Sequence, residues 1–315
     1  MVLRGRLLPS GRVERPPNGL SRPCAPFRPR RAAAKKVLKR ELAAAAAIPA
    51  VLAVLFFLPP IVFNLLVAAV TLAALWEFFR LAEKTAHPVA KTVGMAAGAL
   101  VLLFFSVFWA CQDGRRIGPA AAFLVSGALV FAFLASVAPL FSGVGPAAAL
   151  SGAGSTVFGV VSIALPATAM CYLRSAGASA ERFGPRALLF LFLIVWGCDS
   201  AAYYGGRRFG KRKLAPRVSP NKTVEGTISG LIGATAIGAA AGTWWLLPEF
   251  GPLRGALAGA LASSAGQLGD LVESLWKRGA GVKDSGVFLP GHGGFYDRID
   301  SLLYAGPVVA AFVAF

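Results

Sequence analysis

The sequence predicts an all-α polytopic membrane protein with about nine transmembrane helices. Hydrophobic residues make up 56% of the 315 residues and charged residues only 15%, and the mean hydropathy is +0.65. These values lie outside the range of ordinary soluble domains. Apolar stretches of bilayer length recur along the chain. Acidic residues stand inside or beside them, where each costs several kcal/mol unless it is paired, hydrated or bound to a metal.

The first 40 residues are predicted to be a disordered basic tail. They hold twelve Lys and Arg residues against the single acid Glu14, are rich in Pro and contain no apolar run of signal-peptide length. An upstream start codon or an organellar transit peptide is the alternative explanation. Because the net charge of +18 is concentrated here without interleaved aromatic residues, we expect this excess to face anionic lipid and not nucleic acid.

Nine apolar stretches after Glu41 are expected to cross the membrane, the first and last being marginal in length. They are Leu42–Leu58, Ile61–Leu81, Val93–Ala110, Ala120–Phe141, Ser155–Leu173, Ala187–Tyr204, Val224–Leu247, Leu253–Val272 and Leu302–Phe315. Gly and Ala dominate several of them, as in Ile228–Gly242, so we expect helices to approach closely there. Only two polar breaks between spans are long, 205–223 and 273–301.

Basic residues indicate the orientation of these spans. With the tail inside, the inside segments hold 26 of the 32 Lys and Arg residues, and the outside loops hold six. Since cytoplasmic loops carry the excess of positive charge, both long polar loops are expected in the cytoplasm, where nucleotides are available.

Two aspartates at helix ends are candidate magnesium ligands. Asp270, in GQLGDLVES, ends the eighth span, and Asp297, in GGFYDRIDS, precedes the ninth. Asp300 follows Asp297 by one helical turn and is a third candidate. Mg²⁺ takes one or two protein carboxylates and completes its shell with water and substrate phosphates. An ion pair with a nearby base is the alternative for these side chains.

Other acids lie in or beside the spans. Glu77, in LWEFFR, is expected to be an interfacial residue paired with Arg80 or Lys84. For the remaining acids a purely structural role explains less, because each stands close to a long polar loop. These acids are Asp199, Glu225 and Glu273.

Four bases of the second long loop are the expected phosphate partners: Lys277, Arg278, Lys283 and Arg298. Arg offers a bidentate fork and Lys a mobile point charge. Attraction to anionic lipid is the alternative, but acids interleave with these bases, which suits a polyphosphate with its metal better. The PGHGG run adds backbone N–H groups that can face an anion. Its His292 is expected to bind phosphate, transfer a proton or brace the loop.

The first long loop ends in SPNKT directly before a helix. A Ser or Thr cap with free N–H groups at a helix N-terminus is an anion site in itself. Ser219 and Lys222 are therefore candidate phosphate-binding residues. Orientation of the chain in the membrane is the alternative role for the bases of this loop.

The run S-x-x-K-R-x4-K-D-x-G-x2-L-P-G-H-G-G-x2-D-R-x-D, from Ser274 to Asp300, resembles the signature of the phosphatidate cytidylyltransferases, or CDP-diacylglycerol synthases. The similarity extends from about Trp196 to Ser301 through CDSAAYYGGRRFGKRKLAPRVSPNKTVEG and GQLGDLVES, whereas the N-terminal half matches mainly in hydropathy and in LWEFFRL. Trp276, Asn221 and the pair Ser200-Ala201 depart from the usual pattern. Asn221 replaces a common Lys, which leaves Lys222 as the better candidate for a phosphate contact.

The resemblance implies transfer of a cytidylyl group from CTP to phosphatidic acid, with Mg²⁺, alone or with a second cation, as cofactor. It implies a polar cavity that faces the cytoplasm, with metal-binding aspartates at the positions of Asp270 and Asp297. The expected catalytic residues are Asp270, Asp297, Lys283 and Arg298. The expected substrate-binding residues are Lys222, Ser219, Lys277, Arg278, His292 and Asp199. The expected metal ligands are Asp270, Asp297 and Asp300.

The resemblance also implies a homodimer in the bilayer, in a bacterial inner membrane with its active site on the cytoplasmic side. We expect three parts: the basic tail 1–40, N-terminal transmembrane helices 41–185, and a C-terminal catalytic region 186–315. Another lipid phosphate, such as an isoprenoid ether lipid, remains an alternative substrate. An ion-coupled transporter or an inactive homologue are further alternatives, but the acids gather at cytoplasmic helix ends and not at the midplane, which favours an enzyme.

Overall fold

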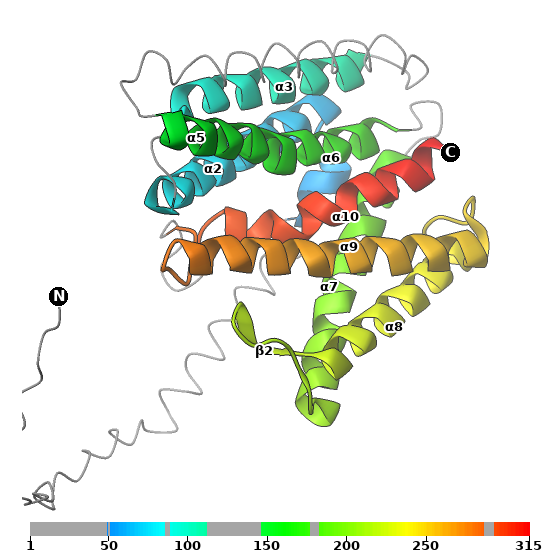
Figure 1. Cartoon of the computed structure of the whole chain (residues 1–315). Helices are drawn as coiled ribbons and strands as arrows, with labels where there is room; N and C mark the ends of the chain where they lie inside the picture. The colour runs from blue at the N-terminus through cyan, green and yellow to red at the C-terminus, as the bar shows by residue number, and fades with distance from the viewer. Residues whose placement is uncertain (1–48, 50, 86–88, 112–145, 177–182, 287–292) are drawn as a thin grey trace, which may run out of the picture. The chain divides into compact units, whose positions relative to one another are not determined.

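The structure is a computed structural model that describes residues 49, 51–85, 89–111, 146–176, 183–286 and 293–315 (Figure 1). The chain divides into two compact units, Met1–Pro49 and Ala50–Phe315, and the second unit holds the helices and strands of the fold. Within the described residues, helices account for all the regular structure except one two-stranded hairpin.

The helices follow one another in chain order, with two π-helical turns continuing α5 and α8. They are α2 (Pro60–Thr85), α3 (Lys91–Cys111), α5 (Pro146–Gly159) with η2 (Val160–Ala164), α6 (Leu165–Ser175), α7 (Phe183–Phe209), α8 (Val224–Ala240) with η3 (Ala241–Trp245), α9 (Gly251–Gly279) and α10 (Tyr296–Ala314). The strands are β1 (Lys213–Ala215) and β2 (Ser219–Thr223).

Five helices in the described part of the chain are long and apolar enough to cross a membrane. They cover Pro60–Thr85, Lys91–Trp109, Ala149–Ser175, Phe183–Phe209 and Val224–Thr243. This confirms the all-helical membrane class. The eighth and ninth expected spans correspond to α9 and α10, which are not among the five. The expected span 120–141 lies outside the described residues, and 42–58 lies only partly within them.

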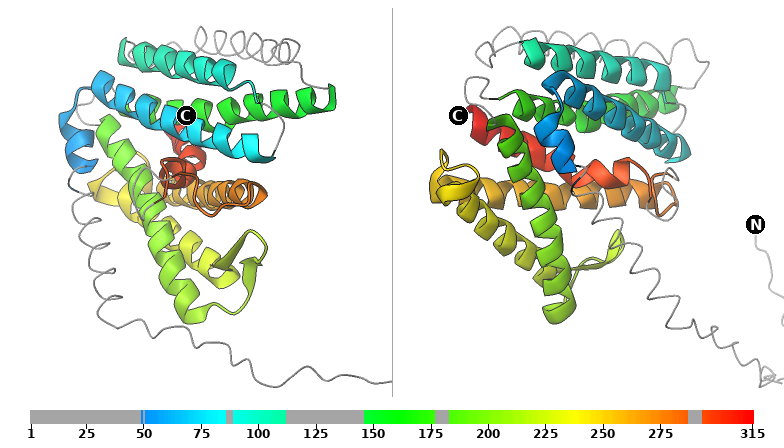
Figure 2. Two further views of the ribbon diagram at one scale, coloured as in Figure 1. Left: turned by 90° about the vertical axis from the view of Figure 1, so that its left-hand side faces the viewer. Right: turned by 180° about the vertical axis from the view of Figure 1, so that it is seen from behind.

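Helix α8 packs between α7 and α9 through small residues, as its composition predicts (Figure 2). A Cβ atom added to Gly238 of α8 would overlap the carbonyl oxygen of Gly255 in α9, and one added to Gly255 would overlap that of Gly238. The two backbones are therefore in direct contact. Such an approach is possible only between glycines.

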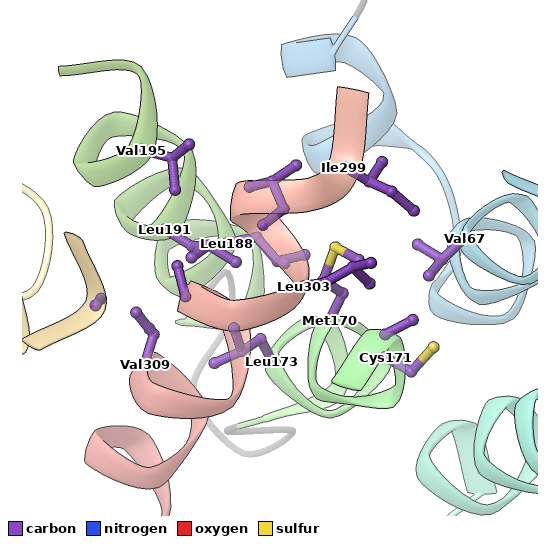
Figure 3. Packing of buried hydrophobic residues seen from close by; sticks show 14 of the residues in the cluster. Val67, Met170, Cys171, Leu173, Leu188, Leu191, Val195, Ile299, Leu303 and Val309 are labelled. Carbon is purple, nitrogen blue, oxygen red and sulfur yellow. The ribbon is translucent and has the colours of Figure 1, made fainter. Parts of the chain in front are cut away.

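Helix α10 lies beside α9 and is surrounded on its other sides by α2, α6 and α7 (Figures 1 and 3). Leu303 of α10 is fully buried in this cluster, next to Met170 of α6 (Figure 3). The helix begins at Tyr296, six residues earlier than the expected span Leu302–Phe315. Its first two turns therefore carry the acids that the sequence singles out.

The hairpin connects α7 to α8. Lys213 pairs with Thr223 in an antiparallel register, and Glu225 accepts hydrogen bonds from the backbone N–H groups of Lys211 (3.0 Å) and Arg212 (3.2 Å). Thr223 Oγ1 accepts one from Gly226 N at 3.2 Å, which confirms the predicted cap of α8. The strands themselves are not predicted from the sequence, because they are short and polar.

Candidate functional site

Three carboxylates from two neighbouring helices meet at one point. Asp270 and Glu273 come from α9, and Asp300 comes from α10. One carboxylate oxygen from each residue lies within 4.8 Å of the other two, and the Glu273 side chain is only 1% exposed. Burial, followed by the nearby carboxyl groups, raises the pKa values of Glu273 and Asp300 above their ordinary range. The cluster therefore concentrates negative charge that protons or a cation must offset.

The donor set of this cluster fits magnesium. All three side chains offer carboxylate oxygens, which hard divalent cations prefer. The buried Oε1 of Glu273 has no hydrogen-bond partner among the described residues, so the site contains an acceptor that a cation would satisfy. Asp270, Glu273 and Asp300 are accordingly the residues able to hold a metal together.

Asp297 lies outside this group and makes other contacts. Its Oδ1 is 2.5 Å from Nζ of Lys277. Its Oδ2 accepts hydrogen bonds from the backbone N–H groups of Gly294 (2.8 Å) and Ser285 (3.0 Å), and the Ser285 hydroxyl is also within 3.0 Å. Burial by itself would raise the pKa of Asp297, but its interactions with Glu273, Lys277 and Gly294 outweigh it and hold the pKa below its usual range.

Lys277 joins the two acidic groups. Its Nζ atom lies 2.5 Å from Oε2 of Glu273 and 2.5 Å from Oδ1 of Asp297, and its side chain is 11% exposed. The sequence predicts Lys277 as a phosphate ligand, whereas both contacts in this structure are to the protein's own carboxylates. Its charge thus links α9 to the first turn of α10.

A polar cavity of about 600 Å³ opens next to the carboxylate cluster. Asp270 lines the cavity and also belongs to the cluster. Three bases and two acids face this space: Arg207, Lys213, Lys222, Asp199 and Asp270. Strand β2 forms one wall of the cavity. From this strand, Nζ of Lys222 lies 2.6 Å from Oδ2 of Asp270. The cavity therefore brings the first long loop together with the end of α9.

Arg278 contacts the hairpin, and Ser219 is part of it. Arg278 donates a hydrogen bond from Nε to Val218 O (3.2 Å) and one from Nη1 to Val282 O (3.1 Å). Ser219 pairs with Ala215 in the strand register. Both residues remain predicted substrate ligands, but neither is among the residues that line the polar cavity.

The remaining predicted site residues are more dispersed. Lys283 is exposed in the segment that follows α9. Arg298 is exposed on α10 and lines a second, mainly apolar cavity of about 450 Å³. His292 lies outside the described residues.

The prediction for Glu77 is wrong. In place of an interfacial ion pair with Arg80 or Lys84, the carboxylate is buried at 7% exposure and accepts hydrogen bonds from the backbone N–H groups of Phe295 (3.1 Å) and Tyr296 (3.0 Å). Its aromatic surroundings in LWEFFR are the one local signal of burial. No spacing in the sequence connects residue 77 with the start of α10.

The sequence is similar to those of known proteins of one family. The sequence model described as "Cytidylyltransferase family" matches residues 38–315. A chain from Haemophilus influenzae named phosphatidate cytidylyltransferase is 33% identical over 294 residues, which cover 88% of this chain and 98% of the relative. Chains of the same name from Brucella suis and Pseudomonas aeruginosa are each 45% identical, over 140 and 124 residues, covering 42% and 39% of this chain and 49% and 46% of the relatives.

Proposed function

The chain belongs to the cytidylyltransferase family, and we propose that it transfers the cytidylyl group of CTP to phosphatidic acid, releasing pyrophosphate and forming CDP-diacylglycerol. The observation that carries this proposal is the polar cavity beside three converging carboxylates, in a chain related over nearly its whole length to a phosphatidate cytidylyltransferase. A triphosphate needs both cations and metal-binding oxygens close together, and the cavity offers both.

In the proposed reaction, a phosphate oxygen of phosphatidic acid attacks the α-phosphorus of CTP. A new P–O bond forms, the bond between the α-phosphorus and the bridging oxygen breaks, and pyrophosphate leaves with that electron pair. The second pKa of a phosphate monoester is about 6, so the nucleophile is already ionised near neutrality and needs no strong general base. Repulsion between two polyanions is the main obstacle, and charge neutralisation with positioning supplies the catalysis.

The residues of the cavity take separate roles in this scheme. Lys222, Lys213 and Arg207 neutralise the phosphates of CTP. Asp270, Glu273 and Asp300 would hold Mg²⁺, which would withdraw charge from the phosphoryl oxygens. Lys222 pairs with Asp270 in this structure and would exchange this partner for a phosphate of CTP.

The finer membrane arrangement is part of the same proposal. We place nine spans in the bilayer of a bacterial inner membrane, with the polar cavity open to the cytoplasm and two copies forming a homodimer. The asymmetry of basic residues, 26 against six, supports the orientation. The dimer rests on the family resemblance.

The test is an assay of the purified full chain in detergent with CTP, phosphatidic acid and Mg²⁺. CDP-lipid and pyrophosphate are expected in equal amounts from the wild type, with strong loss in Asp270→Asn. A folded wild type that releases no pyrophosphate contradicts the proposed function. Product with another lipid phosphate alone would correct the substrate.

A further inference from the structure

Glu77 contacts the start of α10 from a distant part of the sequence. The residue lies on α2, more than two hundred positions before Phe295 and Tyr296, yet its two carboxylate oxygens accept their backbone N–H groups at 3.1 and 3.0 Å. The hydroxyl of Ser285 donates to Oε2 of Glu77 at 2.8 Å. One buried side chain of the N-terminal half thus holds three donors of the C-terminal half.

This carboxylate replaces a missing local cap. Phe295 is the N-cap residue of α10 and makes no side-chain capping bond, and the backbone N–H groups of Phe295 and Tyr296 bond Glu77. An anionic side chain is favoured at this end of a helix because it complements the helix dipole. Glu77 supplies both the acceptor and the charge.

The backbone passes close to Glu77 at two glycines. A Cβ atom added to Gly286 or to Gly294 would overlap the carboxyl group of Glu77. Both glycines flank the part of the signature run outside the described residues. A side chain at either position would displace the Glu77 carboxyl group or move the backbone away from it.

The contacts of Glu77 continue to the carboxylate cluster. Ser285 Oγ lies 2.8 Å from Glu77 Oε2 and 3.0 Å from Asp297 Oδ2. Asp297 pairs with Lys277, which pairs with Glu273 of the cluster. Rotation or fraying of the first turn of α10 would move Asp297 and, one turn later, Asp300.

We propose that Glu77 is a positioning residue for the reaction: it caps α10 from α2 and holds Asp297 and Asp300 in register with α9. The inference rests on the proposed function for its catalytic consequence. It also gives the N-terminal half a direct part in the site. No cation is paired with Glu77 among the described residues, so the backbone of α10 is its main partner.

The experiment compares Glu77→Gln, Glu77→Asp and the matched control Glu83→Gln in the full chain. Glu83 lies on the same helix, and its side chain is 41% exposed beside Lys91. In Glu77→Gln one oxygen becomes an NH₂ group that faces N–H donors, so at least one bond is lost. Changes in groups that orient metal ligands cost about 10- to 100-fold in affinity or activity, and we expect kcat to fall and the half-activating Mg²⁺ concentration to rise within that range. KM for CTP should change by less than about threefold. Glu77→Asp should recover part of kcat.

Amide hydrogen exchange separates positioning from general loss of structure. Exchange should accelerate at residues 293–300 of Glu77→Gln and stay at the wild-type rate in α7 and α8. Faster exchange throughout, with activity proportional to the folded fraction, would overturn the inference, and so would unchanged kcat and Mg²⁺ dependence. If the wild type makes no CDP-lipid, the proposed function fails, while unchanged exchange at 293–300 would still refute the cap.

Discussion

Nζ of Lys222 on strand β2 lies 2.6 Å from Oδ2 of Asp270 on α9, with the two side chains 28% and 32% exposed. This pair joins the two polar segments of the sequence at the rim of the polar cavity. Lys222 comes from the hairpin and Asp270 comes from α9. Neither partner is fully buried, so the pair can open when a phosphate and a cation compete for it.

Replacing Lys222 with Gln tests the phosphate contact. Hydrogen bonds to charged groups are worth about 1.5–3 kcal/mol, so kcat/KM for CTP should fall about 10- to 100-fold in steady-state assays. Lys211→Gln is the control, because that side chain is exposed and only its backbone N–H bonds Glu225. Equal losses in both variants would argue against a specific role for Lys222.

Asn at position 300 should weaken metal binding without unfolding the protein. Changes in the groups that orient metal ligands lower metal affinity by about 10- to 100-fold. Removing a ligand itself is expected to lower Mg²⁺ affinity by at least as much. Activity of Asp300→Asn should recover in part as Mg²⁺ is raised, which a titration of the rate would show. Glu249→Gln, at the exposed pair with Arg186, should behave as wild type. Full activity of Asp300→Asn at low Mg²⁺ would exclude Asp300 as a ligand.

Lys277→Met should destabilise the fold. The substitution leaves Glu273 and Asp297 next to each other without their shared cation, and breaking a buried pair costs about 3–5 kcal/mol. A clear drop in melting temperature is therefore expected in detergent. The double variant Lys277→Met/Glu273→Gln should regain part of the loss. A single variant as stable as wild type would show that Lys277 is dispensable for the junction of α9 with α10.

Gly238→Ala should separate α8 from α9. The added Cβ meets the carbonyl oxygen of Gly255, and overpacking of this kind costs about 1–3 kcal/mol. Gly154→Ala is the matched control, since nothing lies within 4 Å of a Cβ at that helical position. Thermal melts of the two variants should differ clearly, and similar melting temperatures would mean that the helices adjust freely.

Lowering the pH should destabilise the fold because Asp297 becomes protonated. The pKa of this carboxyl is lower in the fold than its unfolded value of about 3.9. The ionised form therefore stabilises the fold above that value, and the stabilisation is lost as pH falls through the folded pKa. Melting temperature should decline between about pH 5 and pH 3, and less steeply in Asp297→Asn. Parallel curves for the two proteins would contradict this contribution.

Local signals in the sequence predict much of the fold. The helical membrane class is confirmed, and small residues in Ile228–Gly242 correctly predict a close packing surface on α8. Thr223 is correctly predicted as a cap. Each of these inferences depends on composition or on residues within one or two helical turns, which the sequence displays directly.

Contacts between residues far apart in the chain are predicted less completely. Asp270 is expected to meet Asp297, but Glu273 and Asp300 form the cluster with Asp270, while Asp297 lies beside Lys277 and Ser285. Two acids one turn apart on α10 thus have different neighbours. Their environments depend on how α10 is rotated against α9, which periodicity alone does not specify.

The sequence by itself determined the membrane class, the family signature and the residue types available for phosphate and metal chemistry, because these are properties of composition and of short motifs. Only the tertiary structure decided which carboxylates converge, that Lys222 crosses to Asp270, and that Glu77 caps α10. The physical reason is that helix packing sets these contacts, and the rotation and depth of each packed helix depend on side chains from the whole bundle.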